Sequence, residues 1–162
     1  MSTQGQSRRS FGERLTTRLA HVGFLLVRPM TLGVRGAVID GDERVLPVKH
    51  TYVAGWHLPG GGVEAGETCE NALARELAEE ANVALEGPPL LHGLYFNAHV
   101  SRRDHVALYV TRRFRLTGER APDREIVAAR FFARDALPED ATRATRARLD
   151  EILGGAPVSA LW

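Results

Sequence analysis

The chain has 162 residues, of which 44% are apolar, and its formal net charge is +1 at neutral pH. That length allows one sizeable hydrophobic core but not two, and the composition is typical of a soluble globular protein. The balanced charge does not favour a nucleic-acid partner. Lys49 is the only lysine, and we interpret the bias towards arginine as codon usage in a GC-rich genome.

The N-terminal part of the chain precedes the segments that carry strand patterns. Residues 1–9 are polar, and we expect them to form a disordered tail. Within an N-terminal segment of residues 10–31, four apolar residues repeat at helical spacing: Phe11, Leu15, Leu19 and Val22. The spacing predicts an amphipathic helix over residues 10–22 that covers the core of the domain. A homodimer interface and a membrane surface are alternatives that the sequence leaves open.

No segment of the sequence is expected to span a membrane. The apolar run over residues 22–27 is too short to cross a bilayer, and no secretory cleavage pattern precedes it. Cys69 is the only cysteine, so an intramolecular disulfide is excluded and a reducing compartment is favoured. We therefore expect a cytoplasmic protein.

Five segments carry the apolar and β-branched patterns of strands. These segments cover residues 32–39, 44–49, 90–100, 105–116 and 126–132. Gly41 and Asp42 indicate a turn between the first two. Residues 139–153 have a helical composition and are followed by two glycines, which are typical of a helix C-terminus. This order of elements predicts a mixed α/β domain.

The most informative segment covers residues 61–83 and reads GGVEAGETCENALARELAEEANV. Thr68 is a suitable N-cap, and Asn82 can adopt the left-handed backbone conformation that ends a helix. We therefore expect a helix between these two residues. Three apolar residues recur at spacing four and give the helix a face for packing against the core: Leu73, Leu77 and Ala81.

A second face of this helix carries three carboxylates. Glu76, Glu79 and Glu80 are separated by three and four positions, so they converge on one side of a helix. Closely packed carboxylates repel one another, and a divalent cation relieves that repulsion. Oxygen ligands favour magnesium, manganese or calcium over zinc. The pattern predicts a metal site, whereas the alternative is a solvated acidic face. Arg75 belongs to neither face, and we expect it to pair with Glu67.

The segment resembles the Nudix box of the Nudix hydrolase superfamily. The residues that carry the resemblance are Gly61, Glu67, Arg75-Glu76-Leu77, Glu79-Glu80 and Asn82-Val83. Five residues separate Gly61 from Glu67, seven separate Glu67 from Arg75, and one residue lies in each of the two later gaps. Asn82 departs from the family, which usually has glycine there. Because asparagine also tolerates a positive φ, the turn should survive the replacement.

The resemblance implies a fold and a domain organisation. The fold is a Nudix-type α/β/α sandwich with a mixed central sheet and a box that forms a loop, a helix and a second loop. The hydrolase domain would cover residues 32–155, and residues 156–162 would form a C-terminal tail. The predicted N-terminal and C-terminal helices would flank the central part of this domain.

The family binds a divalent metal at the box, and a water molecule attacks phosphorus within a diphosphate linkage. The resemblance implies that Mg²⁺ or Mn²⁺ is the cofactor of this chain. Its protein ligands would be the three box carboxylates and the backbone carbonyl of Gly60, that is, Glu76, Glu79, Glu80 and Gly60. Glu67 and Arg75 would hold the loop against the helix and so orient the carboxylates.

Two carboxylates are candidates for the general base that activates the water. Glu76 is the first choice among the box carboxylates. Glu125 lies outside the box, just before the last predicted strand, and some family members recruit an acid from such a distant loop. A structural or solvated role is the alternative for Glu125.

Several side chains outside the box are candidates for substrate contact. Trp56 could stack on a base, although a packing role in the core is the alternative. Arg102 and Arg103 lie in a predicted turn and could bind phosphates, unless they are only solvated. His50 and His57 flank Trp56 and could contact phosphate, although we interpret them as surface histidines.

The sequence therefore predicts a metal-dependent pyrophosphohydrolase. Its substrate would be a small nucleotide-type molecule, a nucleoside diphosphate linked to another moiety, and not a nucleic acid. No subfamily marker outside the box identifies that moiety. The alternative function is a binding or sensor domain that holds a nucleotide metabolite on a Nudix scaffold without cleaving it.

Overall fold

The centre of the fold is a three-stranded mixed sheet. β1 (Thr31–Val38) pairs in parallel with β6 (Asp104–Thr111), and β6 pairs antiparallel with β5 (Leu90–Phe96).

The computed structural model describes residues 29–162. The tail expected over residues 1–9 and the helix expected over residues 10–22 therefore lie outside the described residues.

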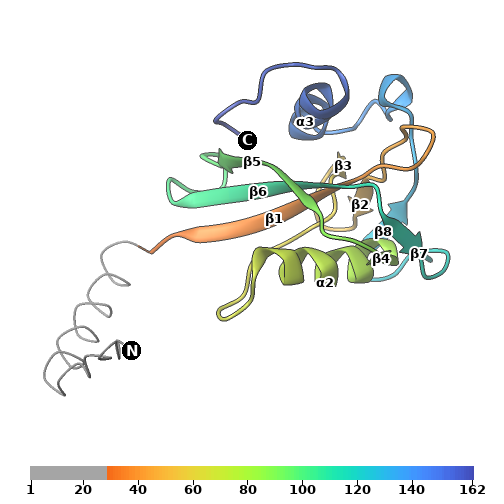
Figure 1. Ribbon diagram of the computed structural model, residues 1–162, viewed down its shortest axis with the longest axis horizontal. Coiled ribbons are helices and arrows are strands. Elements are labelled where there is room, and N and C mark those ends of the chain that lie inside the picture. The colour runs from red at the N-terminus through yellow and green to blue at the C-terminus, as the bar shows by residue number, and fades with distance from the viewer. Residues whose placement is uncertain (1–28) are drawn as a thin grey trace, which may run out of the picture. The chain divides into compact units, whose positions relative to one another are not determined.

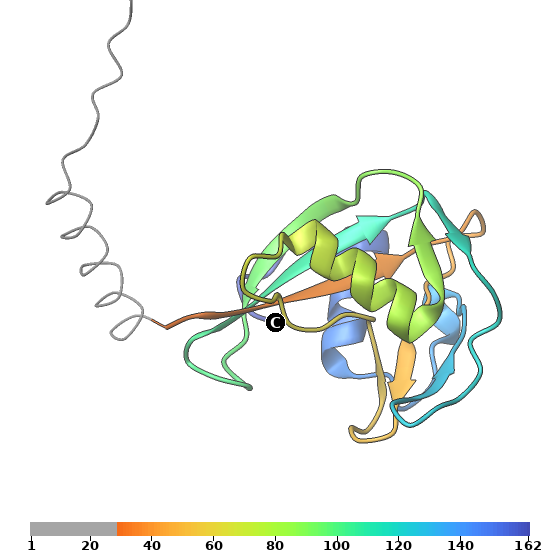
Figure 2. The ribbon, with the colours of Figure 1, turned by 90° about the horizontal axis from the view of Figure 1, so that it is seen from below.

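Two helices cover opposite faces of this sheet, as Figures 1 and 2 show from two directions. On one face α2 (Cys69–Ala81) packs against β1, and on the other lies α3 (Arg143–Leu153). Alternate residues of β1 serve the two faces, because successive side chains of a strand point to opposite sides. Val34 and Val38 pack with α2, whereas Ala37, and Ile39 directly after the strand, pack in the cluster that contains Leu149 of α3. The expected α/β/α sandwich is confirmed.

Two smaller sheets extend the domain at the far end of α2. β2 (Val48–His50) lies between β3 (Trp56–His57) and β8 (Ile126–Ala129), and both pairings are antiparallel. β4 (Val83–Leu85) pairs antiparallel with β7 (Phe114–Leu116). A single 3-10 turn, η1 (Arg134–Ala136), connects the last strand to the region before α3.

The long strand predicted over residues 105–116 is wrong, because the structure divides it. β6 ends at Thr111, and β7 begins at Phe114 and leaves the central sheet to pair with β4. Arg112 lies in the break and pairs with Glu43, which sits in a turn with a φ of 56°. The composition of the segment was that of a strand throughout, and only the tertiary pairing shows where it bends.

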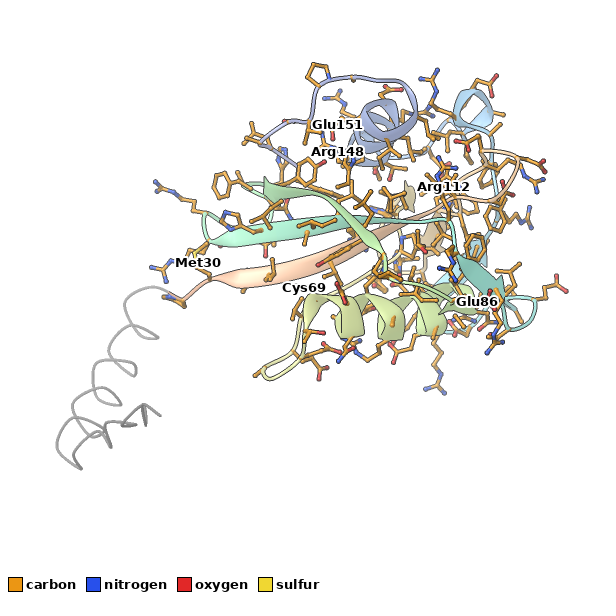
Figure 3. All side chains as sticks on the ribbon, viewed as in Figure 1. Met30, Cys69, Glu86, Arg112, Arg148 and Glu151 are labelled. Atoms are coloured by element: carbon orange, nitrogen blue, oxygen red, sulfur yellow. The ribbon has the colours of Figure 1, made fainter. Side chains whose placement is uncertain are left out.

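A buried ion pair fastens α3 to the sheet and to the segment that follows the helix (Figure 3). Arg148 donates to Glu151 at 2.6 Å and to the carbonyl of Leu161 at 2.7 Å, and both charged side chains are less than 10% exposed. The hydroxyl of Tyr95 on β5 donates to the same glutamate at 2.7 Å. Because each charge is neutralised and hydrogen-bonded, the pair can stay out of water. It holds the segment ending at Trp162 against the domain.

Within residues 29–162, no helix is long and apolar enough to cross a bilayer.

The end of α2 gives a first testable prediction. Asn82 has φ 53° and ψ 38°, as expected from the sequence, and its side chain donates to the carbonyl of Glu119 at 3.0 Å. Replacing it by alanine imposes left-handed strain and removes that bond, so Asn82→Ala should lower the free energy of unfolding by about 1–2 kcal/mol. Asn82→Gly, the matched control, loses the same hydrogen bond but adopts the left-handed conformation without strain, so it should be about 1 kcal/mol more stable than the alanine variant. Urea unfolding measures both, and equal stability of the alanine variant and the wild type would contradict the prediction.

Candidate active site

The carboxylate helix forms where the sequence predicts it, because both of its ends are capped. The hydroxyl oxygen of Thr68 accepts a hydrogen bond from the backbone amide of Asn71 at 3.2 Å, and Asn82 ends the helix in the left-handed conformation. The predicted apolar residues Leu73, Leu77 and Ala81 are at most 3% exposed. Their burial against β1 fixes which face of α2 is left for the glutamates.

The glycine turn before α2 lies directly on β1. The amide of Val34 donates to the carbonyl of Gly61, and the amide of Gly36 donates to that of Pro59, both at 2.8 Å. Gly60 has φ 139°, and a Cβ atom there would lie 2.1 Å from the carbonyl oxygen of Val34. Only glycine fits so close to another backbone. The turn is therefore held rigidly between β1 and the carboxylates of α2.

Arg75 forms the expected pair with Glu67 and contacts more of the box besides. Its guanidinium donates to both carboxylate oxygens of Glu67 at 3.2 Å, to Glu76 at 2.7 Å and to the carbonyl of Gly62 at 3.2 Å. The hydrogen bond from Arg75 is the main cause that holds the pKa of Glu67 below its usual range. Arg75 thus ties the loop to the helix and fixes the position of Glu76.

The three box glutamates line one cavity of about 670 Å³, which we call the carboxylate cavity. Gly60 and Gly61 line it too, and so does Glu125, the candidate from outside the box. The cavity has five carboxylates and only two arginines in its wall: Glu76, Glu79, Glu80, Asp123, Glu125, Arg35 and Arg120. The structure therefore brings together the site carboxylates expected from distant parts of the sequence.

Glu80 is the most perturbed of these carboxylates. It is 9% exposed, and one of its oxygens accepts the amide of Gly60 at 2.8 Å. Burial raises the pKa of Glu80 from its ordinary 4.5 to about 7, and the charges of Glu76 and Glu125 act in the same direction. The Gly60 amide and the charge of Arg35 oppose the shift without cancelling it. A cation beside Glu80 would relieve this unfavourable charge.

The donor set fits a hard divalent cation, because it consists of carboxylate and carbonyl oxygens around a polar cavity. Within residues 29–162, however, no three acidic, histidine or cysteine side chains already stand close enough to form a complete ligand set. Glu76 is turned towards Arg75, and Glu79 is 62% exposed at its side chain. Metal binding would therefore draw the carboxylates together from these positions.

Arg35 is a site residue that sequence reasoning missed. Its guanidinium donates to the carbonyl of Leu58 at 3.1 Å and to that of Gly60, the backbone group expected to bind metal. A positive charge thus lies beside the carboxylates. The available signal was a lone arginine within the otherwise apolar strand segment of residues 32–39.

Arg35 also lines a second cavity of about 550 Å³, which we call the histidine cavity because His50, His57 and His99 lie in its wall. The interpretation of His50 as a surface residue is wrong, since it is 6% exposed. Burial, and then the charges of Arg35 and His57, lower the pKa of His50 from 6.5 to about 4. It is therefore neutral at pH 7 and forms no ion pair with Glu80, although the nearest atoms of the two are 3.6 Å apart.

The candidate substrate residues Trp56, Arg102 and Arg103 line neither the carboxylate cavity nor the histidine cavity. Trp56 is 7% exposed and packs edge-on against Phe132 with ring centroids 5.0 Å apart, which is the packing alternative. Arg102 and Arg103 are exposed in the turn between β5 and β6. The side chains next to the carboxylates are instead Arg35, Tyr52 and Arg120.

The glycine turn places the carboxylates of α2 at a polar cavity, beside a mixed sheet that two helices cover. This fold and this site belong to a class of hydrolases that act on phosphorus-containing anhydrides. The profile of the NUDIX domain matches residues 29–151. The chain belongs to the Nudix hydrolase family.

Known members of the family carry different names. An ADP-ribose pyrophosphatase of Methanocaldococcus jannaschii is 32% identical over 105 residues, which are 63% of this chain and 62% of that protein. A Mycobacterium tuberculosis protein, provisionally named 8-oxo-dGTP diphosphatase 2, is 39% identical over 113 residues, or 66% and 77% of the two chains. The crystal structure of a MutT NUDIX hydrolase from Burkholderia pseudomallei superposes with a TM-score of 0.64 at 31% identity, covering 75% of this chain and 97% of the other.

The burial of Glu80 predicts a pH-dependent stability. The pKa of Glu80 in the folded protein lies above its ordinary value. Ionisation of Glu80 therefore lowers the free energy of unfolding as the pH rises from about 4.5 through 7. In EDTA at pH 8, Glu80→Gln should therefore raise the free energy of unfolding by about 2 kcal/mol and the Tm by about 4–8 °C. At pH 4.5 the gain should vanish, because Glu80 is then protonated. Thermal unfolding at the two pH values measures it, and a glutamine variant less stable at pH 8 would refute the argument.

Proposed function

We propose that this chain is a divalent-metal-dependent pyrophosphohydrolase that cleaves a diphosphate linkage in a nucleoside diphosphate joined to another moiety. The observation that carries the proposal is the convergence of Glu76, Glu79, Glu80 and Glu125 on one cavity beside the glycine turn. The relatives are named for ADP-ribose and for 8-oxo-dGTP, which share a phosphoanhydride and a nucleoside and little else. These names support the chemistry and leave the second moiety open.

The metal, when bound, would neutralise phosphate oxygens and make a bound water more acidic. The box glutamates and the carbonyl of Gly60 would hold it. Glu80 accepts a hydrogen bond from the Gly60 amide and Glu76 accepts one from Arg75, so both carboxylates are held beside the cavity and would need only a local shift to bind a metal. Arg35 and Arg120 line the same cavity and would bind the charged oxygens of a diphosphate.

A carboxylate must also accept a proton from the attacking water. Glu76 is the first choice, and Glu125 is the alternative because it lies in the same cavity without belonging to the box. The amide of Glu125 donates to Asp123 at 2.8 Å, and Asp123 in turn accepts Arg120, so this loop has an ordered connection to the cavity. Both residues are therefore tested together.

The deciding experiment is a phosphate-release screen, coupled to phosphatase or pyrophosphatase, over nucleoside triphosphates, oxidised nucleotides, ADP-ribose, NADH, sugar nucleotides and dinucleoside polyphosphates. Turnover should require Mg²⁺ or Mn²⁺ and should fall at least 100-fold in Glu79→Gln, because a metal ligand is lost. Glu76→Gln and Glu125→Gln compare the two base candidates, and the true base should lower kcat far more than the metal affinity. Metal-independent turnover, or full activity in Glu79→Gln, would refute the proposal.

A sensor domain without hydrolysis is the alternative function. If the chain were a sensor, a nucleotide would raise the Tm of the wild type, but no compound in the screen would be turned over. The retention of Glu67, of the three box glutamates that line the cavity and of Arg75 favours the enzyme.

The close contact between Gly61 and Glu76 gives a further prediction. A Cβ atom at position 61 would lie 2.4 Å from a carboxylate oxygen of Glu76, so Gly61→Ala must displace that side chain. We expect kcat/KM to fall at least tenfold, because a shift of about 1 Å at a catalytic group has effects of that order. Gly62→Ala is the matched control, since a Cβ there would meet nothing within 4 Å. Equal losses in the two variants would contradict this role of Gly61.

A further inference from the structure

We propose that Asp123 is a positioning residue for the reaction, because it fixes Glu125 at the carboxylate cavity. Both residues lie in the loop that connects β7 to β8, and Arg120 joins this loop to α2. The inference rests on the proposed function. It extends the reaction machinery to a loop that the Nudix box does not include.

The carboxylate of Asp123 folds the chain into a turn just before β8. One of its oxygens accepts hydrogen bonds from the amides of Glu125 and Ile126, both at 2.8 Å, and the other accepts one from Arg120. The amide of Ile126 and then the Arg120 side chain are the main causes that lower the pKa of Asp123 to about 2. Asp123 is therefore ionised at neutral pH, and the protein engages both of its oxygens.

The backbone of Glu125 is held from β2 as well. Its carbonyl accepts the amide of Thr51 at 2.9 Å, and the hydroxyl of Thr51 donates to the carbonyl of Arg124 at 2.7 Å. Thr51 directly follows β2, whose last residue pairs with Ile126 of β8. Both the amide and the carbonyl of Glu125 are thus hydrogen-bonded, which fixes the point where its side chain leaves the backbone.

Arg120 attaches this loop to the end of the carboxylate helix. Its side chain is 13% exposed, and its three guanidinium nitrogens donate to the carbonyls of Glu80 and Ala121 and to Asp123. Two N–H groups remain for a diphosphate, because a guanidinium has five. The carbonyl of Glu80 lies in the last turn of α2, where carbonyl groups lack partners within the helix and attract cations. The loop is therefore tied to a residue whose carboxylate lines the same cavity.

Glu125 differs from the box carboxylates in the way it is held. Arg75 and the Gly60 amide donate to the carboxylates of Glu76 and Glu80, respectively. The hydrogen bonds that hold Glu125 reach its backbone, while its side chain lines the cavity. A carboxylate that is placed through its backbone keeps its oxygens for water, metal or substrate. Asp123 thus orients Glu125 without occupying it.

A double-mutant cycle tests whether Asp123 acts through Glu125. Activity is measured with Mg²⁺ and whichever of ADP-ribose and 8-oxo-dGTP the wild type cleaves faster. Asp123→Ala should lower kcat at least tenfold and change KM less than threefold, because a displaced carboxylate affects the reaction more than binding. In the Glu125→Gln background the same substitution should lower kcat less than threefold, since no carboxylate is left to position.

Three outcomes would contradict the inference. A tenfold loss from Asp123→Ala in both backgrounds would show that Asp123 acts on another group. An unchanged kcat in Asp123→Ala or in Glu125→Gln would show that the reaction does not use this loop. In each of these cases a loss of turnover in Glu79→Gln would leave the proposed function intact. If the wild type cleaves neither compound, the inference fails together with the proposed function for these compounds.

Asp40 supplies a matched control for the loss of a turn. Its carboxylate accepts the amides of Asp42 and Arg44 at 3.0 and 2.9 Å and pairs with the Arg44 side chain, but it lines neither cavity. Asp40→Ala should therefore keep kcat and KM within twofold of the wild type. Asp123→Asn keeps an acceptor for the two amides and loses the ion pair with Arg120, so it should retain more of kcat than Asp123→Ala. The Tm of each variant shows that it folds.

Amide hydrogen exchange tests the turn without any turnover. In Asp123→Ala the amides of Glu125 and Ile126 should exchange at least tenfold faster, because they lose their acceptor. The amide of Asp42 should be unaffected by that substitution and should exchange faster in Asp40→Ala. If the amides of Glu125 and Ile126 exchange in Asp123→Ala as slowly as in the wild type, Asp123 does not fix this loop and the inference is overturned.

Discussion

The close packing of the glycine turn between β1 and α2 is the constraint from which the candidate site follows. Gly60 has no room for a Cβ atom against the backbone of Val34, and Gly61 has none against the carboxylate of Glu76. Because the turn is hydrogen-bonded along β1, the amide of Gly60 points to Glu80 in a fixed direction. The sheet thus determines the position of the turn, and the turn determines the positions of two carboxylates.

Charge is distributed unequally over the box. Glu67 is paired with Arg75, and its pKa is held low, whereas Glu80 is buried and its pKa is raised. This contrast fits a cation site, because Glu67 orients the loop and is neutralised by Arg75, whereas the charge of Glu80 is neutralised by no hydrogen-bonded arginine among the described residues. The fold tolerates the unfavourable charge of Glu80 because the rest of α2 is well packed and capped at both ends.

Local features of the fold and the site could be predicted from the sequence. Thr68, Asn82 and the spacing of Leu73 and Leu77 specify α2 through contacts within one or two helical turns. The pairing of Arg75 with Glu67 was predictable for the same reason. The break after Thr111, the burial of His50 and the joining of Arg35 to both cavities were not, because they depend on segments far apart in the chain. Trp56 shows the same limit, since its pattern fits both a stacking surface and the core position that it occupies.

The parallel pairing of β1 with β6 has a consequence for the order of folding. Thr31 and Asp104 are 73 positions apart, yet they are neighbours in the central sheet. During synthesis the carboxylate helix therefore leaves the ribosome before the strand that completes the sheet beneath it. Until about residue 111 has emerged, the apolar face of α2 cannot pack against β6. The box glutamates on α2 then have no packed sheet to hold them in position. A nascent chain of this protein acquires its candidate site only after most of the domain has been translated.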